Sequence, residues 1–224
     1  MKMIDKETYL FALLDDMANR SKRPKEFNEI FTSSNFNASY LPLNIRDDDI
    51  LFTVNGLKKS QISGVNIGET YQEEVLPILD SFSDEVEKCG FVDSLKIENG
   101  KLFGYITIGE ALSTLTDKKI AIFGSGAIAK STVSHINDIT KVTVIEKYIE
   151  DSEDILKLFP SLDIRFSDES HKFDNSDYSL IIKLTEDEIF LTSPESSEII
   201  EFQDGKAPAK VRKIQNQIDI REWL

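Results

Sequence analysis

The stretch from Lys118 to Lys147, KKIAIFGSGAIAKSTVSHINDITKVTVIEK, decides the fold of the C-terminal half of the chain. An apolar run over 120–123 is followed by a glycine-rich segment, 124–129, and then by a helix-like segment. A second apolar run over 142–145, rich in β-branched residues, ends on the acidic Glu146. The order of strand, glycine turn, helix, strand and acid predicts a βαβ unit of the kind that binds dinucleotides.

The glycine motif offers what a nucleotide phosphate needs close to the main chain. Gly124 permits a tight turn, and Gly126 has no Cβ, so a pyrophosphate can approach the backbone there. The helix that follows offers free N–H groups and the positive end of its dipole. Glu146 lies 20 residues after Gly126, where a carboxylate would meet a ribose hydroxyl. We therefore expect cofactor contacts at Gly124, Ser125, Gly126, Ala127, Ile128, Ala129, Glu146 and Lys147. The alternative is an α/β crossover that keeps its glycines only for the turn.

Composition and charge restrict the classes of partner. The 224 residues are 40% hydrophobic and 29% charged, which is typical of a globular protein with one large or two small domains. A net charge of −14 argues against nucleic-acid and membrane partners. It does not exclude an anionic small ligand, because a local nest of backbone N–H groups binds phosphate whatever the global charge.

Few residues suit metal, thiol or imidazole chemistry. Cys89 is the only cysteine, so we expect neither a disulfide nor a metal site. Lys2 and Asp5 interrupt any apolar run at the N-terminus, so we expect no signal peptide or membrane span and a cytoplasmic location. His135 and His171 stand alone, and we expect them to be structural or solvated.

Strand and helix patterns alternate along the whole chain, which favours the α/β class. In the first half, helices are predicted over 24–32, 47–59, 72–79 and 110–116, strands over 40–43 and 62–67, and a hairpin over 92–97 and 102–106 around Asn99-Gly100. In the second half, the pattern predicts a helix over 153–159, strands over 162–166 and 178–184, and an edge hairpin over 188–192 and 198–202. Because the glycine motif starts a new βαβ series, the domain boundary is placed within 112–117.

Five short motifs follow one another between residues 20 and 147. They are Tyr40-Leu41-Pro42, SGVNI at 63–67, YQEEV at 71–75, GKLFGYITIG at 100–109, and the glycine motif. In this order they resemble the shikimate dehydrogenase family, whose segments read Y-x-P, G-V-N-V-T, h-K-x-x-V and G-x-L-x-G-x-N-T-D-G. The resemblance implies an α/β fold of two domains. These are an N-terminal α/β substrate-type domain, 1–112, and a shortened C-terminal Rossmann-like dinucleotide-binding domain, 113–224.

The resemblance also implies a chemistry that this chain lacks. The family reduces 3-dehydroshikimate with NADPH and handles the hydroxyl proton with a Lys–Asp pair. Here Gln72 stands where the lysine should be, and Ile108 stands where the aspartate should be. Neither side chain transfers a proton at neutral pH, so we predict no catalytic residue. If the alignment with the family motifs is shifted by a residue or two, Lys58, Lys59 or Asp80 are the candidates for the missing Lys–Asp pair.

Other family ligands are also replaced, while glycines and apolar framework positions remain. The N-terminal S-x-S-P-x-x-H-N segment has Arg23 for its second serine and Phe27 for its histidine. Gly68 replaces the threonine of the G-V-N-V-T motif, and Ile106 replaces an asparagine. The substrate-binding positions that the resemblance implies are Ser21, Asn28, Asn66, Gln72, Asp93 and Thr107.

Two expectations concern the C-terminal half. The family continues into a G-x-x-M-L-x-x-Q segment and a closing helix that returns a glutamine to the substrate, and we recognise no such segment before Leu224. The basic tail from Gly205 is expected to be a solvated helix or a partner-binding element. Glu146-Lys147-Tyr148 stands where NADP-dependent members usually carry N-R-T. A carboxylate repels a 2′-phosphate, so NAD is expected and NADP is less favoured.

Three functions remain open. The first is a shikimate dehydrogenase-like protein, inactive on shikimate, that acts as a ligand-binding or scaffold protein. The second is an NAD-dependent oxidoreductase acting on a different small substrate, and the third is an ordinary shikimate dehydrogenase whose site has been misread. We expect the partner to be a small molecule or a protein, and the sequence leaves open whether the chain forms a homodimer.

Overall fold

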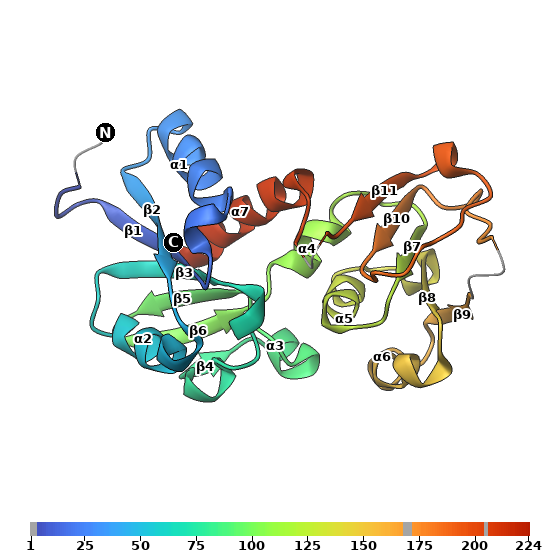
Figure 1. Cartoon of the computed structure of the whole chain (residues 1–224), viewed down its shortest axis with the longest axis horizontal. Helices are drawn as coiled ribbons and strands as arrows, with labels where there is room; N and C mark the ends of the chain where they lie inside the picture. Colours follow the sequence, from blue (N-terminus) through green and yellow to red (C-terminus); the bar gives the residue numbers. More distant parts are fainter. Residues whose placement is uncertain (1–3, 168–171, 204–205) are drawn as a thin grey trace. The chain divides into compact units, whose positions relative to one another are not determined.

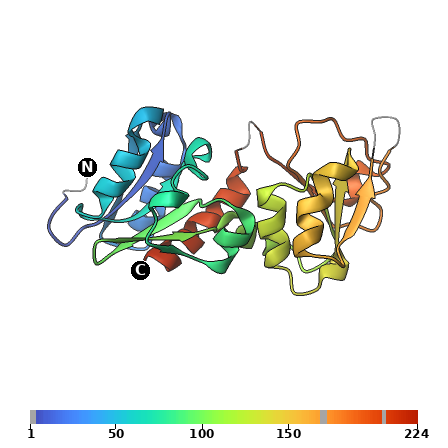
Figure 2. The ribbon, with the colours of Figure 1, turned by 90° about the horizontal axis from the view of Figure 1, so that it is seen from below.

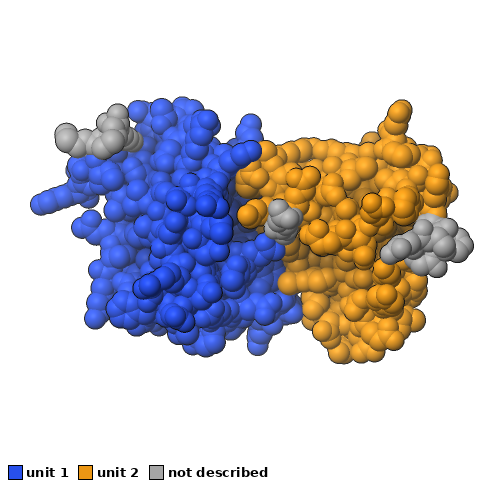
Figure 3. Space-filling view, viewed as in Figure 1, with its two compact units in different colours: residues 1–107, 213–224 blue, residues 108–212 orange. Residues whose placement is uncertain are grey.

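The chain forms two compact units, shown in two colours in Figure 3. The structure, a computed structural model, describes residues 4–167, 172–203 and 206–224. Unit 1 comprises Met1–Thr107 and Lys213–Leu224, and unit 2 comprises Ile108–Arg212. This division differs from the predicted domains 1–112 and 113–224, because residues 108–112 lie in unit 2 and residues 213–224 return to unit 1. His171 lies outside the described residues.

Unit 1 is built on a six-stranded mixed sheet in the order β2-β1-β3-β5-β6-β4 (Figure 1). The strands β2, β1 and β3 run parallel to one another, whereas β5 runs antiparallel to both β3 and β6. The strands are β1 (Tyr9–Asp15), β2 (Ala38–Asn44), β3 (Ile62–Ile67), β4 (Ser81–Phe82), β5 (Ser94–Glu98) and β6 (Lys101–Tyr105). The helices are α1 (Arg23–Ser33), α2 (Ile50–Leu57) and α3 (Asp84–Cys89).

One predicted turn in unit 1 is confirmed and one predicted helix is wrong. Asn99 and Gly100 both adopt positive φ, 52° and 72°, as the tight turn between β5 and β6 requires. The segment 72–79 is not an α-helix: it holds turns and a short 3-10 helix, Leu76–Ile78. Pro77 explains the difference, because proline disfavours helical backbone at the residue before it and has no N–H to donate.

Unit 2 is built on a five-stranded parallel sheet in the order β11-β10-β7-β8-β9. Its strands are β7 (Ile120–Phe123), β8 (Val142–Glu146), β9 (Asp163–Phe166), β10 (Leu180–Lys183) and β11 (Glu198–Glu201). Its helices are α4 (Ile108–Ser113), α5 (Ala127–Ser134) and α6 (Glu153–Leu158). Because the crossovers β7-α5-β8 and β8-α6-β9 step in the same direction, right-handed connections place α5 and α6 on one face, as Figure 2 shows. The predicted βαβ unit is confirmed.

The edge hairpin predicted for 188–192 and 198–202 is wrong. β11 pairs in parallel with β10, with Leu180 opposite Glu198. Residues 188–192 form no strand and contribute one isolated bridge, between Phe173 and Leu191. The chain between β10 and β11 therefore returns to the edge of the sheet at which β10 begins, instead of forming a tight turn.

The C-terminal helix α7 (Ala209–Trp223) is part of the core of unit 1, so the prediction of a solvated or partner-binding tail is wrong. The Trp223 indole stacks on Phe11 with a centroid distance of 4.9 Å. It also lies where a side chain at position 64 would be, because a Cβ on Gly64 would approach the ring to 2.3 Å. The aromatic cluster around it comprises Phe11, Phe27, Phe31, Tyr40 and Trp223.

Candidate functional site

The glycine turn after β7 has an open backbone. Gly124 adopts φ of +102°, a conformation that favours glycine, and its N–H donates to the Ile145 carbonyl at 3.0 Å. Gly126 precedes α5, and a Cβ built on it would meet no atom within 4 Å. The space beside Gly126 is therefore free for a group that approaches the N-terminus of α5, which is what a dinucleotide phosphate requires.

The other residues of the turn support its shape. The Ser125 hydroxyl is buried and donates to the Asp151 carbonyl at 2.5 Å, so it ties the turn to the segment after β8. Ala129 is fully buried in α5, in line with close packing of the helix. Ala127 and Ile128 occupy the first turn of α5 and are half-buried.

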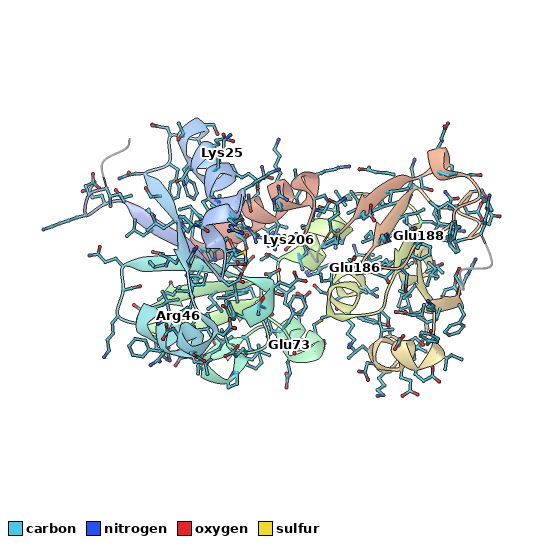
Figure 4. The ribbon with its side chains drawn as sticks, viewed as in Figure 1. Lys25, Arg46, Glu73, Glu186, Glu188 and Lys206 are labelled. Atoms are coloured by element: carbon cyan, nitrogen blue, oxygen red, sulfur yellow. The ribbon has the colours of Figure 1, made fainter. Side chains whose placement is uncertain are left out.

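Glu146 ends β8 and borders a pocket beside the glycine turn. Lys147 Nζ lies 3.7 Å from Asp187 Oδ1, across that pocket. Figure 4 labels Glu186 and Glu188 on the acidic segment that follows β10. The pocket is lined by Phe123, Gly124, Ile145, Glu146, Lys147, Ser167, Thr185, Asp187, Glu188, Ile189 and Phe190. Carboxylates thus outnumber cations on its lining.

Unit 1 holds a buried polar centre around Thr107, which follows β6. The Asp93 carboxyl accepts hydrogen bonds from the Thr107 N–H at 2.8 Å and from Gln215 Nε2 at 3.0 Å. The Thr107 hydroxyl lies 3.0 Å from Asp93 Oδ1 and 3.1 Å from Gln215 Nε2. All three side chains are at least 97% buried. The glutamine comes from α7, so the expectation that no C-terminal segment returns a glutamine to this region was wrong.

An ion pair completes the polar centre. Arg23 Nη2 lies 3.0 Å from Asp219 Oδ2, and Arg23 Nε donates to Asn216 Oδ1 at 3.1 Å. Asp219 is fully buried, and its Oδ1 lies 2.9 Å from the Thr107 hydroxyl. Burial raises the pKa of Asp219, while Arg23 opposes that rise. Asn216 Nδ2 is buried with no hydrogen-bond partner among the described residues.

The remaining predicted substrate residues make hydrogen bonds within unit 1. Asn28 ties α1 to β2 through the Tyr40 backbone, accepting at 3.0 Å and donating at 2.9 Å. Asn66 accepts from the Tyr40 hydroxyl at 2.8 Å. The Ser21 hydroxyl accepts from the Arg23 N–H at 3.2 Å, and Gln72 Nε2 donates to the Ile67 carbonyl at 3.2 Å.

The polar centre contains residues that the sequence analysis missed: Arg23, Gln215, Asn216 and Asp219. The signal was available, because Gln215, Asp219 and Trp223 recur at every fourth position and therefore share one face of a helix. Polar residues on the same face as a tryptophan indicate a buried polar seam.

Lys58 and Asp80, the alternative proton-transfer residues, do form an ion pair, with 2.9 Å between Nζ and Oδ2. Asp80 also accepts from the Leu102 N–H at 2.8 Å, which places the pair near the start of β6. Thr107 follows the opposite end of that strand. The pair therefore lies apart from the polar centre, and hydrogen bonds from Leu102 and Lys58 lower the pKa of Asp80.

The described residues contain neither a cluster of metal-ligating side chains nor a membrane-spanning helix. Within residues 4–167, 172–203 and 206–224, no group of three or more His, Cys, Asp and Glu side chains is arranged to hold a metal ion. No helix in those ranges has the length and hydrophobicity that crossing a bilayer requires.

The two units together define a two-part α/β protein whose second unit is a parallel sheet with a glycine turn at its centre. Residues 14–95 match the family model for the shikimate dehydrogenase substrate binding domain. This part of the chain is therefore similar to the substrate binding domain of shikimate dehydrogenases.

Individual shikimate dehydrogenases are also similar to this chain. A shikimate dehydrogenase (NADP(+)) of Pyrococcus furiosus is 29% identical over 162 residues, covering 69% of this chain and 59% of the relative. The chain thus matches just over half the length of that curated relative. A crystal structure of a shikimate dehydrogenase in complex with NADP+ superposes with a TM-score of 0.76 at 18% identity, covering 99% of this chain and 91% of the other. A 5-ketofructose reductase of Gluconobacter superposes with a TM-score of 0.80 at 16% identity, covering 98% and 94%. Both superpositions cover nearly the whole chain, in agreement with the predicted α/β fold of two domains.

Proposed function

We propose that this protein binds a nicotinamide dinucleotide in unit 2 and is inactive on shikimate, so that it acts as a ligand-binding or scaffold protein. The observation that carries the proposal is the state of the polar centre. Asp93, Thr107 and Gln215 bond to one another, and Asp219 bonds to Arg23. Groups that would bind a polyhydroxylated substrate are engaged within the protein.

The missing proton-transfer pair supports the same proposal. Gln72 donates its amide to the Ile67 carbonyl, and Ile108 is buried at the start of α4. Loss of general acid–base catalysis costs about 10²–10⁴-fold in rate. Loss of substrate positioning adds to that cost.

The glycine turn supports the cofactor part of the proposal. The shikimate dehydrogenases that resemble this chain carry NADP(+) in their names. The open space at Gly126 fits a pyrophosphate held by the turn and by the first N–H groups of α5. We propose that NAD is preferred here over NADP, because Glu146, Asp187 and Glu188 border the adjoining pocket and would oppose a 2′-phosphate. When bound, such a cofactor accepts or donates a hydride.

A second function, that of an NAD-dependent oxidoreductase with a different small substrate, is favoured by the same open turn. A pure scaffold needs neither Gly126 nor Glu146. The two proposals differ in whether the bound cofactor turns over.

Titration calorimetry and a turnover assay test the proposal. We expect NAD to bind more tightly than NADP, and shikimate with either cofactor to give no turnover in the ordinary range of about 1–10³ per second. The double variant Gln72→Lys/Ile108→Asp should remain inactive, because Arg23 and Asp219 still occupy the polar centre. Ordinary turnover by the unaltered chain would refute the inactivity. Absence of binding of either cofactor would refute the cofactor assignment.

A further inference from the structure

The helix α2 turns one face toward the core of unit 1 and another toward solvent. Its buried side chains are Ile50, Val54 and Leu57. On the other side, Phe52 is 83% exposed, the largest exposed fraction among the large hydrophobic side chains of the described residues. Leu51 beside it is 39% exposed. Single exposed apolar residues are common on proteins, so the surroundings of this pair decide whether it belongs to a contact surface.

The exposed side of α2, here called the outer face, extends beyond this pair in both directions. Its residues recur at helical spacing, which places them along one side of the helix and of the turns that flank it. All of them are exposed, and in chain order they are Asp48, Leu51, Phe52, Asn55, Gly56 and Lys59. A Cβ on Gly56 would meet no atom within 4 Å, so the side chain of a second molecule can approach the main chain there.

The residues of the outer face are arranged symmetrically about its midpoint. When two copies of a helix pack antiparallel about a two-fold axis, each residue faces the one at the same distance on the other side of the axis. With the axis at the midpoint of the outer face, the facing pairs are Asp48 with Lys59, Leu51 with Gly56, and Phe52 with Asn55. An acid thus faces a base at both ends, and each large apolar side chain faces a smaller residue.

The two charged ends of the outer face are available for such a contact. Neither Asp48 nor Lys59 forms an ion pair with another of the described residues. At the basic end, Lys58 Nζ lies 2.9 Å from Asp80 Oδ2, so the charge of Lys58 is balanced within the chain, whereas that of Lys59 is not. At the acidic end, the exposed Asp47 adds to the negative charge of Asp48. This charge complementarity favours a second copy of the same chain as the partner.

We propose that the outer face of α2 is the contact surface of a homodimer, in which the α2 helices of two copies pack antiparallel about a two-fold axis. Phe52 of each copy packs over Asn55 and Gly56 of the other. The net charge of −14 on each copy opposes association, and one helix face is small for an obligate interface. The dimer is therefore weak and depends on concentration. This inference does not depend on the proposed function, because α2 belongs neither to the glycine turn nor to the polar centre.

Sedimentation equilibrium of the full chain tests the apolar part of the contact. We expect the mean mass of the unaltered protein to rise from monomer toward dimer as its concentration is raised to about 1 mM. Because the two-fold axis repeats every contact, one substitution removes two contacts. Phe52→Ser should therefore weaken the dimer by about tenfold or more. Ile149→Ser, at a 61% exposed isoleucine of unit 2, is the matched control and should dimerise like the unaltered protein.

Charge reversal tests the antiparallel arrangement itself. Asp48→Lys and Lys59→Asp should each weaken the dimer by about tenfold, because like charges then face each other at both ends. Mixed in equal amounts, the two variants should form a heterodimer as stable as the unaltered dimer, because every acid again faces a base. Glu87→Lys, at an exposed glutamate of α3, makes the same change of charge elsewhere in unit 1 and should not pair with Lys59→Asp in this way.

Three outcomes would overturn the proposal. The first is an unaltered chain that stays monomeric up to about 1 mM. The second is a dimer that Phe52→Ser leaves unchanged, which would place the contact on another surface. The third is a mixture of Asp48→Lys and Lys59→Asp that associates no better than either variant alone.

Discussion

The glycine turn of unit 2 and the polar centre of unit 1 treat their polar groups in opposite ways. At the turn, Gly126 leaves space beside free backbone N–H groups at the start of α5. In the polar centre, side chains of α1, of α7 and of the residues next to β5 and β6 bond to one another, with Arg23 and Asp219 as the charged pair. The polar groups of an open site can form hydrogen bonds with a ligand, whereas those of the polar centre already form hydrogen bonds that stabilise the fold.

This difference has a physical consequence for substitutions. A change at the turn should alter ligand binding and leave folding almost intact. A change in the polar centre should alter folding first, because buried polar groups that lose their partners are costly.

The largest effect is expected at Arg23. Arg23→Met leaves the fully buried Asp219 without its cation, which should reduce the free energy of unfolding by about 3 kcal/mol. Denaturant unfolding measures the loss. The double variant Arg23→Met/Asp219→Asn removes the unpaired charge and should recover most of the stability. A single variant as stable as the unaltered chain would mean that the ion pair does not hold the polar centre together.

A smaller effect on stability, but a large one on binding, is expected at Gly126. Gly126→Val meets no atom of the folded protein at its Cβ, so stability should change little. Its branched side chain would fill the space proposed for the pyrophosphate. Calorimetry should show NAD affinity lowered by about 100-fold, equivalent to about 2.8 kcal/mol. Gly56→Ala, at a glycine in α2 with equally free surroundings, is the control and should bind normally. Unchanged NAD affinity in Gly126→Val would place the cofactor elsewhere.

The same comparison explains what could be predicted from the sequence. The turn of unit 2 depends on neighbours within one βαβ unit, so the period of apolar residues and two glycines were sufficient to locate it. The polar centre depends on residues far apart in the chain: Gln215 contacts Asp93 across 122 positions, and Trp223 contacts Ser94 across 129. No local pattern specifies such pairings.

Two predictions of local structure failed for different reasons. The segment 188–192 has the apolar character of a strand, but whether it pairs depends on where the chain re-enters the sheet at β11. The segment 72–79 has helical spacing, but Pro77 interrupts the backbone pattern that the spacing requires. The family resemblance named Thr107 and Asp93 as substrate-binding positions and Arg23 as a replaced ligand, and these three residues lie in one buried centre. It gave no sign that Asp219 would join them.

The smallest effect is expected at Glu146, where the open site discriminates between cofactors. The Glu146 carboxylate ends β8 beside the pocket, half-buried, and can accept hydrogen bonds from a ribose diol. The same charge repels a 2′-phosphate, but solvent screens part of the repulsion. Glu146→Ala should therefore narrow the preference for NAD over NADP by about three- to tenfold, equivalent to about 0.7–1.4 kcal/mol. Calorimetry with both cofactors measures the ratio at low and at physiological ionic strength, and the change should be larger at low salt. Glu150→Ala, at an exposed carboxylate of the same unit, serves as the control and should leave the ratio unchanged. If the unaltered protein binds NADP more tightly than NAD, Glu146 does not face the ribose, and the acidic segment after β10 must lie clear of the 2′-phosphate.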